Sequence, residues 1–124
     1  MSEEPLFTQL NVQPLPGAGL LVRFQAKRVL GESQVYAARD ELFSLVAPER
    51  ILLLDLSNIV YLSSTMLGVF IRLQRHLREQ SGEMSLCGLP PDIAEVFRIT
   101  KLDKTFHIYA NLESALSRDG VGTW

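Results

Sequence analysis

A strand followed by a helix is predicted by the segment Ile51-Leu-Leu-Leu-Asp-Leu-Ser-Asn-Ile-Val-Tyr-Leu-Ser-Ser-Thr-Met-Leu-Gly-Val69. It opens with an apolar run of strand length, which is typical of a central strand covered on both faces. From the first helical turn onward, apolar residues recur at helical spacing: Met66, Val69, Phe70, Leu73 and Leu77. Gly82 then lies where a glycine is favoured at the end of a helix.

The rest of the chain also divides into strand and helix patterns. Two strands are predicted upstream, at residues 7–12 and 20–29, and the turn-rich run between them favours an antiparallel pair. A helix follows from Ser33 and is stopped by Pro48. The elements expected downstream are a strand at 84–87, a helix at 90–97, a strand at 106–109 and a helix at 112–116 capped by Asn111. This order predicts an α/β domain whose mixed sheet has four to five strands packed with about four helices.

Length and composition point to one globular domain. The chain has 124 residues, of which 47% are hydrophobic and 21% charged, with a net charge of −2. We expect a single domain at residues 1–116 and a flexible tail at 117–124. Basic residues form no cluster that would follow a phosphate backbone, which argues against nucleic acid as a partner.

Several features favour a cytoplasmic protein. A single cysteine, Cys87, excludes an internal disulfide and suits a reducing compartment. Glu3 and Glu4 stand where a secretory signal would carry positive charge, and no apolar run is long enough to cross a bilayer.

The residue pattern gives little support for catalysis. His76 and His107 lack further ligands at a useful spacing, so we expect no metal and no cofactor. Ser64 lacks the Gly-x-Ser-x-Gly turn of a nucleophilic serine and an evident base, and no glycine-rich phosphate loop occurs. We therefore expect a protein that acts by binding another protein, not an enzyme.

The segment from Asp55 to Val69 resembles the signature of the STAS domain family, which is typified by bacterial anti-sigma factor antagonists. That signature is a strand ending in Asp-Leu-Ser, a short loop, and Asp-Ser-Ser-Gly-Leu-Gly at the start of a helix. Cys87-Gly-Leu-Pro-Pro-Asp-Ile-Ala-Glu-Val-Phe97, followed by Lys101-Leu-Asp103, resembles the family's second landmark. The similarity extends from about residue 20 to residue 116 and implies a single STAS-like domain.

The resemblance also implies a mode of action. In such antagonists a hydroxyl at the start of the second helix is phosphorylated by an anti-sigma factor with kinase activity, and phosphorylation releases that partner. The acceptor position falls on Thr65, with Ser64 beside it. The expected partner-binding residues are Ser63, Ser64, Thr65, Met66, Leu67, Arg72 and Arg75. Ser63 replaces the family's Asp. Met66 replaces its Gly, and the added bulk is expected either to obstruct a kinase cleft or to supply a new apolar contact.

Other interpretations of these residues remain open. The run Ser63-Ser-Thr65 is also what a simple helix cap requires. Asp55 is either a structural acceptor for the loop or part of an acidic site. The arginines at 72, 75 and 78 form either a solvated helix face or an interface. The alternative function is a phosphorylation-independent adaptor or scaffold in a signalling complex.

Overall fold

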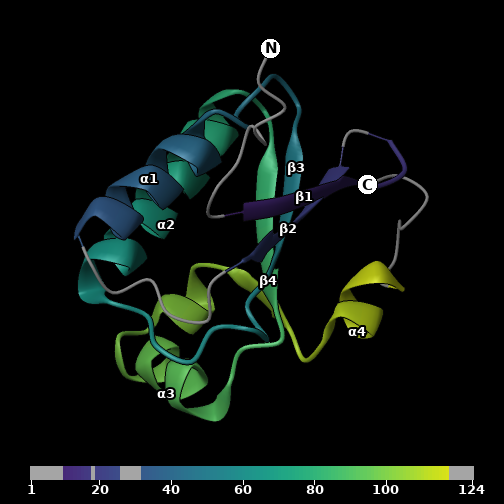
Figure 1. The fold of residues 1–124 in the computed structure, drawn as a ribbon. Helices are drawn as coiled ribbons and strands as arrows, with labels where there is room; N and C mark the ends of the chain where they lie inside the picture. Colours follow the sequence, from purple (N-terminus) through teal and green to yellow (C-terminus); the bar gives the residue numbers. More distant parts are fainter. Residues whose placement is uncertain (1–9, 18, 26–31, 118–124) are drawn as a thin grey trace.

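The computed structural model describes residues 10–17, 19–25 and 32–117. Within these residues, five strands and four helices follow one another (Figure 1). The strands are β1 (Leu10–Pro14), β2 (Gly19–Phe24), β3 (Ile51–Asp55), β4 (Glu83–Cys87) and β5 (His107–Tyr109). The helices are α1 (Glu32–Phe43), α2 (Ser64–Glu79), α3 (Pro91–Ile99) and α4 (Leu112–Leu116), with a short 3-10 turn at Leu102–Lys104.

The strands form one mixed sheet in the order β1-β2-β3-β4-β5. β1 pairs antiparallel with β2, and the remaining neighbours are parallel. β3 is the central strand, and Leu52, Leu53 and Leu54 are fully buried. The predicted antiparallel pair and central strand are both confirmed.

The two faces of the sheet are covered unequally. α1 and α2 lie together on one face, and α4 lies on the other (Figure 1). Alternate residues of β3 point to opposite sides, so Leu52 and Leu54 belong to the large core under α1 and α2. Leu53 instead packs with Leu21, Cys87 and Ala115 in a small second core beneath α4.

Most predicted elements occur with shifted boundaries. The first helix ends at Phe43, ahead of Pro48. The last strand is limited to His107–Tyr109, and Asn111 caps α4 by accepting a hydrogen bond from Ser114 N–H (2.7 Å). The expected strand residues 7–9 and 26–29, and residues 118–124 of the expected tail, lie outside the described residues. Among the described residues, no helix is both long and apolar enough to span a membrane.

The end of α2 differs from the sequence-based prediction by one residue. Ser81, with a φ of 65°, adopts the left-handed conformation that was expected of the glycine after it. Gly82 N–H donates to the carbonyl of Leu77 (2.7 Å), and a Cβ at Gly82 would lie 2.3 Å from the carbonyl oxygen of Arg50. Glycine is therefore needed at 82 because the chain entering β3 passes so close.

Replacing Gly82 with alanine should lower the free energy of unfolding by about 3 kcal/mol, because backbone atoms on both sides must move. Gly68→Ala is the matched control: it lies inside α2, where the new Cβ would meet only the end of the Arg72 side chain at 3.6 Å. That change should raise stability by about 0.5–1 kcal/mol, through the better helix propensity of alanine. Urea unfolding of both variants measures the difference, and equal stability would contradict the packing at Gly82.

Candidate functional site

The loop after β3 and the loop after β4 leave the sheet side by side. Asp55 and Cys87 are register partners at the ends of these strands, and Leu56 N–H donates to the carbonyl of Cys87 (2.9 Å). In parallel sheets, binding sites form at this carboxyl edge of the strands. The starts of α2 and α3 are therefore brought to the same edge of the molecule.

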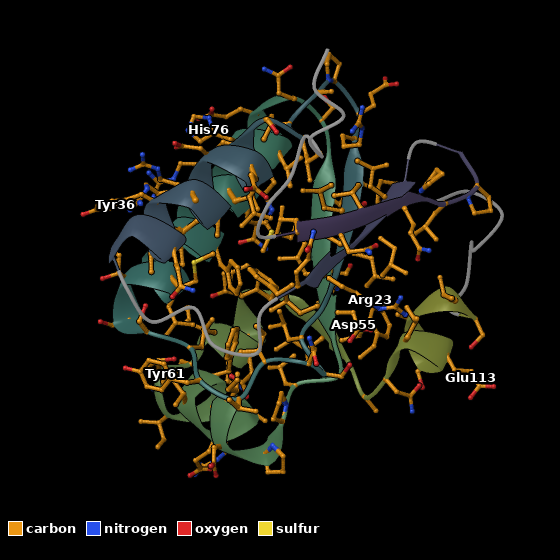
Figure 2. All side chains as sticks on the ribbon, viewed as in Figure 1. Arg23, Tyr36, Asp55, Tyr61, His76 and Glu113 are labelled. Carbon is orange, nitrogen blue, oxygen red and sulfur yellow. The ribbon has the colours of Figure 1, made fainter. Side chains whose placement is uncertain are left out.

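Asp55 holds the first of these loops in place. Its carboxylate accepts hydrogen bonds from Arg23 Nε and from Ser57 N–H, both at 3.0 Å (Figure 2). Burial acts to raise the pKa of Asp55, but the bonds from Ser57 and the ion pair with Arg23 outweigh it, so the pKa lies below its usual value. Asp55 is thus better interpreted as a structural acceptor than as part of an acidic site, because its carboxylate already binds Arg23 of β2 and the backbone of the loop.

Asp55→Asn should remove this support and cost about 1–3 kcal/mol of unfolding free energy at neutral pH. Because the folded carboxyl is more acidic than the unfolded one, its contribution is present at neutral pH and lost as the pH falls below about 4. The stability difference between wild type and Asp55→Asn should therefore shrink on acidification. Asp40→Asn, at a carboxylate of 69% side-chain exposure, is the control and should change little. A difference that stays constant down to low pH would contradict the ion pair.

The hydroxyl run at the start of α2 divides into one capping residue and two exposed residues. Ser63 is the N-cap: its Oγ accepts a hydrogen bond from Met66 N–H (3.1 Å). Ser64 and Thr65, the first two helical residues, are exposed. The capping interpretation therefore applies to Ser63, while the hydroxyls of Ser64 and Thr65 are accessible at the positive end of the helix dipole.

Two of the expected partner-binding residues are not on this surface. Met66 is fully buried and Leu67 is 9% exposed, and both belong to the large core. Met66 shares the apolar stripe of α2 with Val69 and Phe70, so its side chain points toward the sheet. The expectation that Met66 and Leu67 contact a partner is wrong, and Met66 supplies no new surface contact.

The two arginines expected at the rim lie on different parts of α2. Arg72 follows Thr65 by two helical turns, which places it about 10 Å along the axis on the same side. Its guanidinium approaches Gly68, nearer the start of the helix. Arg75 lies further round the helix and lines a groove with Gln74 and Arg78. Only Arg72 is placed to border the hydroxyl pair.

Sequence reasoning missed two exposed apolar residues that precede the hydroxyls by a few positions in the chain. Val60 is 52% exposed and Tyr61 is 47% exposed, and both lie in the loop that leads into α2. On α3, Val96 and Ile99 are also exposed. The available signal was an apolar run, Ile59-Val-Tyr-Leu62, in a segment with neither strand nor helix period. Ile59 is buried in the core, whereas Val60 and Tyr61 are exposed and do not contribute to the core.

Cys87, predicted to be a small core residue, is fully buried in β4. Burial, followed by the nearby charge of Asp55, raises the pKa of its thiol to about 12. The thiol is therefore protonated at neutral pH. Among the described residues, no group of three or more His, Cys, Asp or Glu side chains could hold a metal ion.

Comparison with known proteins agrees with this arrangement. The family model for the STAS domain matches residues 11–115. The chain belongs to the STAS domain family. Its α/β architecture, with a five-stranded mixed sheet and four helices, matches that of solved STAS structures.

Several relatives of this STAS domain are named as regulators. An anti-sigma-B factor antagonist of Listeria monocytogenes is 29% identical over 100 residues, which is 81% of this chain and 80% of that protein. BtrV of Bordetella bronchiseptica, named as an anti-sigma factor antagonist, is 37% identical over 67 residues, 54% of this chain and 58% of that protein.

Solved structures share the fold at low identity. An anti-sigma factor antagonist from Mycobacterium paratuberculosis superposes with a TM-score of 0.74 at 23% identity, covering 87% of this chain and 90% of that one. The unphosphorylated form of the antagonist SpoIIAA gives a TM-score of 0.71 at 17% identity, covering 88% and 94%.

Proposed function

We propose that this STAS domain is an anti-sigma factor antagonist whose partner exchange is controlled by phosphorylation at Thr65, with Ser64 as the neighbouring acceptor. The observation that carries the proposal is the pair of exposed hydroxyls at the start of α2, which follow the exposed apolar residues Val60 and Tyr61 within a few positions of the chain. The relatives' names point to an anti-sigma factor as the partner, and the family resemblance implies that this factor has kinase activity. Because the exchange uses ATP and concerns sigma factors, we expect it to take place in the cytoplasm.

A phosphate at Thr65 would act locally. The first backbone N–H groups of a helix have no intrahelical partner, and Ser63 occupies only that of Met66. The helix start can therefore accept the roughly −1.5 to −2 charges of a phosphate without unfolding. The first turn of α2 contains no acidic residue that would repel this charge.

The same phosphate would disrupt a bound partner. Val60 and Tyr61 offer an apolar contact of the kind found at the centre of interfaces. A partner docked over these residues would also cover Thr65. A phosphate there would have to be desolvated against the partner, so binding would weaken while the fold is retained.

Tyr61→Ser should reduce affinity for the anti-sigma factor kinase by about tenfold or more, because buried tyrosines contribute strongly to interface energy. Tyr36→Ser is a close control: Tyr36 is 46% exposed, nearly the same as Tyr61, but lies on α1 (Figure 2). Binding of both variants is measured by titration calorimetry after their melting temperatures are compared. Equal affinities for the two variants would show that the partner docks elsewhere.

The modification itself is tested by incubating the protein with ATP and the kinase captured from the native cell. Mass spectrometry should locate one phosphate on the peptide that contains Thr65. Thr65→Ala should abolish or greatly slow incorporation, and Ser64→Ala should leave it largely intact. Phosphate that survives in the double alanine variant would contradict the assignment to these hydroxyls.

A further inference from the structure

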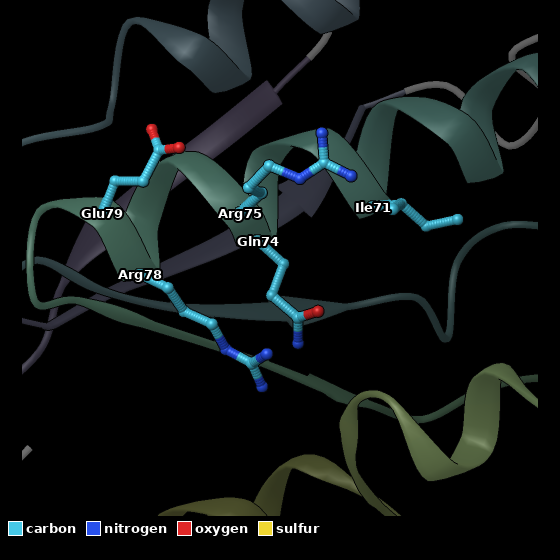
Figure 3. A pocket seen from close by; sticks show the side chains of 5 residues that line it. All are labelled: Ile71, Gln74, Arg75, Arg78 and Glu79. Atoms are coloured by element: carbon cyan, nitrogen blue, oxygen red, sulfur yellow. The ribbon is translucent and has the colours of Figure 1, made fainter.

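A groove runs between the second half of α2 and the start of β5, away from the hydroxyl pair. It consists of two adjoining hollows of about 410 and 220 Å³ that share Gln74 and Arg78. Ile71, Arg75 and Glu79 complete the first hollow (Figure 3), and Glu83, Met84 and His107 complete the second. Arg78 lies about 20 Å along α2 from Thr65, so a ligand in the groove would not compete with a partner at the hydroxyls.

Two cationic side chains of the groove have no anionic partner within the described part of the chain. Arg75 and Arg78 are exposed, and neither forms an ion pair with a carboxylate among the described residues. Glu79, the acidic residue nearest to them along the helix, is 3.7 Å from His76 Nδ1 instead. Figure 3 shows Gln74 and Arg78 extending to one side of α2, with Arg75 and Glu79 along the other rim. The groove therefore offers two guanidinium groups to carboxylates or phosphates.

The amide of Gln74 gives the groove a hydrogen-bond acceptor beside the two arginines. Gln74 is 4% exposed, and its Nε2 donates to the carbonyl oxygen of Thr105 (3.1 Å). The described residues donate no hydrogen bond to its Oε1, and this oxygen is not one of their fully buried unpartnered atoms, so it is open to solvent. This oxygen can only accept a hydrogen bond, and a carboxylate has no proton to donate to it. A peptide, in contrast, supplies N–H donors from its backbone as well as carboxylates from its side chains.

From these contacts we propose that the groove is a docking site for an extended acidic segment of a partner protein. Carboxylates of the segment bind Arg75 and Arg78, a backbone N–H donates to Gln74 Oε1, and an apolar side chain contacts Ile71. Glu79 and Glu83 lie toward the end of α2 and the start of β4, so the segment places neutral or basic residues there. Both arginines are exposed, so the site is an open groove. Small molecules bind mostly in enclosed pockets, whereas an open groove suits an extended chain segment.

The test uses the full chain and labelled peptides of about ten residues, with Asp or Glu at alternate positions of one half and neutral or basic residues in the other half. Fluorescence anisotropy should detect binding that weakens by about tenfold or more in Arg75→Glu/Arg78→Glu. Arg39→Glu/Arg98→Glu changes the net charge equally at arginines outside the groove and should keep affinity within about twofold. Peptides with Asn and Gln in place of the acids should not bind.

Nuclear magnetic resonance locates the contact independently. Addition of the acidic peptides should shift the amide signals of Ile71, Gln74 and His107 and leave those of Ser64 and Thr65 in place. Equal loss of affinity in the two double variants, or no binding at millimolar peptide, would overturn the proposal. Displacement of the peptides by millimolar inorganic phosphate, with the same signals shifted, would also overturn it in favour of a small-anion site. None of these outcomes depends on phosphorylation of Thr65.

Discussion

Leu53→Asp should abolish cooperative folding. Leu53 is fully buried on β3, between Leu21 on β2 and Ser85 on β4. Its side chain packs in the small second core, where an aspartate would have no cationic partner among the core side chains. A typical domain is stabilised by only roughly 5–15 kcal/mol. Burying an unpaired charge costs enough free energy to cancel that stability. Circular dichroism and thermal melting should show no native transition.

Two further variants separate charge from other effects. Asn11→Asp introduces the same carboxylate at an exposed position on β1 and should melt close to wild type. Leu53→Asn has nearly the shape of aspartate without its charge, so it should be destabilised but less severely. A soluble Leu53→Asp protein with a sharp melting transition would contradict the central position of β3 in a sheet covered on both faces.

Thr65→Glu should weaken binding to the anti-sigma factor kinase by about tenfold or more while leaving the fold intact. Glutamate places one negative charge in the first turn of α2, where the helix dipole favours it, so the melting temperature should change little. At the interface the same charge must be desolvated against the partner. Thr65→Ala, which lacks both hydroxyl and charge, should bind like wild type and become insensitive to ATP.

A charge-matched control is available for this comparison. Gln13→Glu adds one negative charge at an exposed position on β1, distant in sequence from the start of α2. Titration calorimetry should give similar affinities for wild type, Thr65→Ala and Gln13→Glu. The affinity of Thr65→Glu should be lower. Equal affinity for Thr65→Glu and Gln13→Glu would show that the partner does not cover Thr65.

The parts of the fold that depend on local periodicity could be predicted from the sequence. The apolar run of β3 and the stripe from Met66 to Leu77 on α2 are strong signals, and both elements lie where expected. The end of α2 was harder to predict. Ser81 takes the left-handed turn because Gly82 is held by its close approach to Arg50, a contact between segments far apart in sequence.

The candidate site shows the same division. Exposed hydroxyls at the start of α2 follow from the motif and from helix geometry. Met66 could have been excluded from the surface, since it starts the very stripe that predicts the helix. The groove beside Arg78 could not be foreseen, because the bond from Gln74 to Thr105 joins residues far apart in the chain. Local pattern gives the face of a helix, but not what packs against it.

The most direct test of the proposed switch compares the unmodified protein with protein phosphorylated to completion at Thr65. Binding of each form to the captured kinase is measured by titration calorimetry under identical salt and nucleotide conditions. The unphosphorylated form should bind, and the phosphorylated form should bind at least about tenfold more weakly, a difference of about 1.4 kcal/mol. Equal affinity for the two forms would contradict the switch and leave the phosphorylation-independent adaptor as the function of this domain.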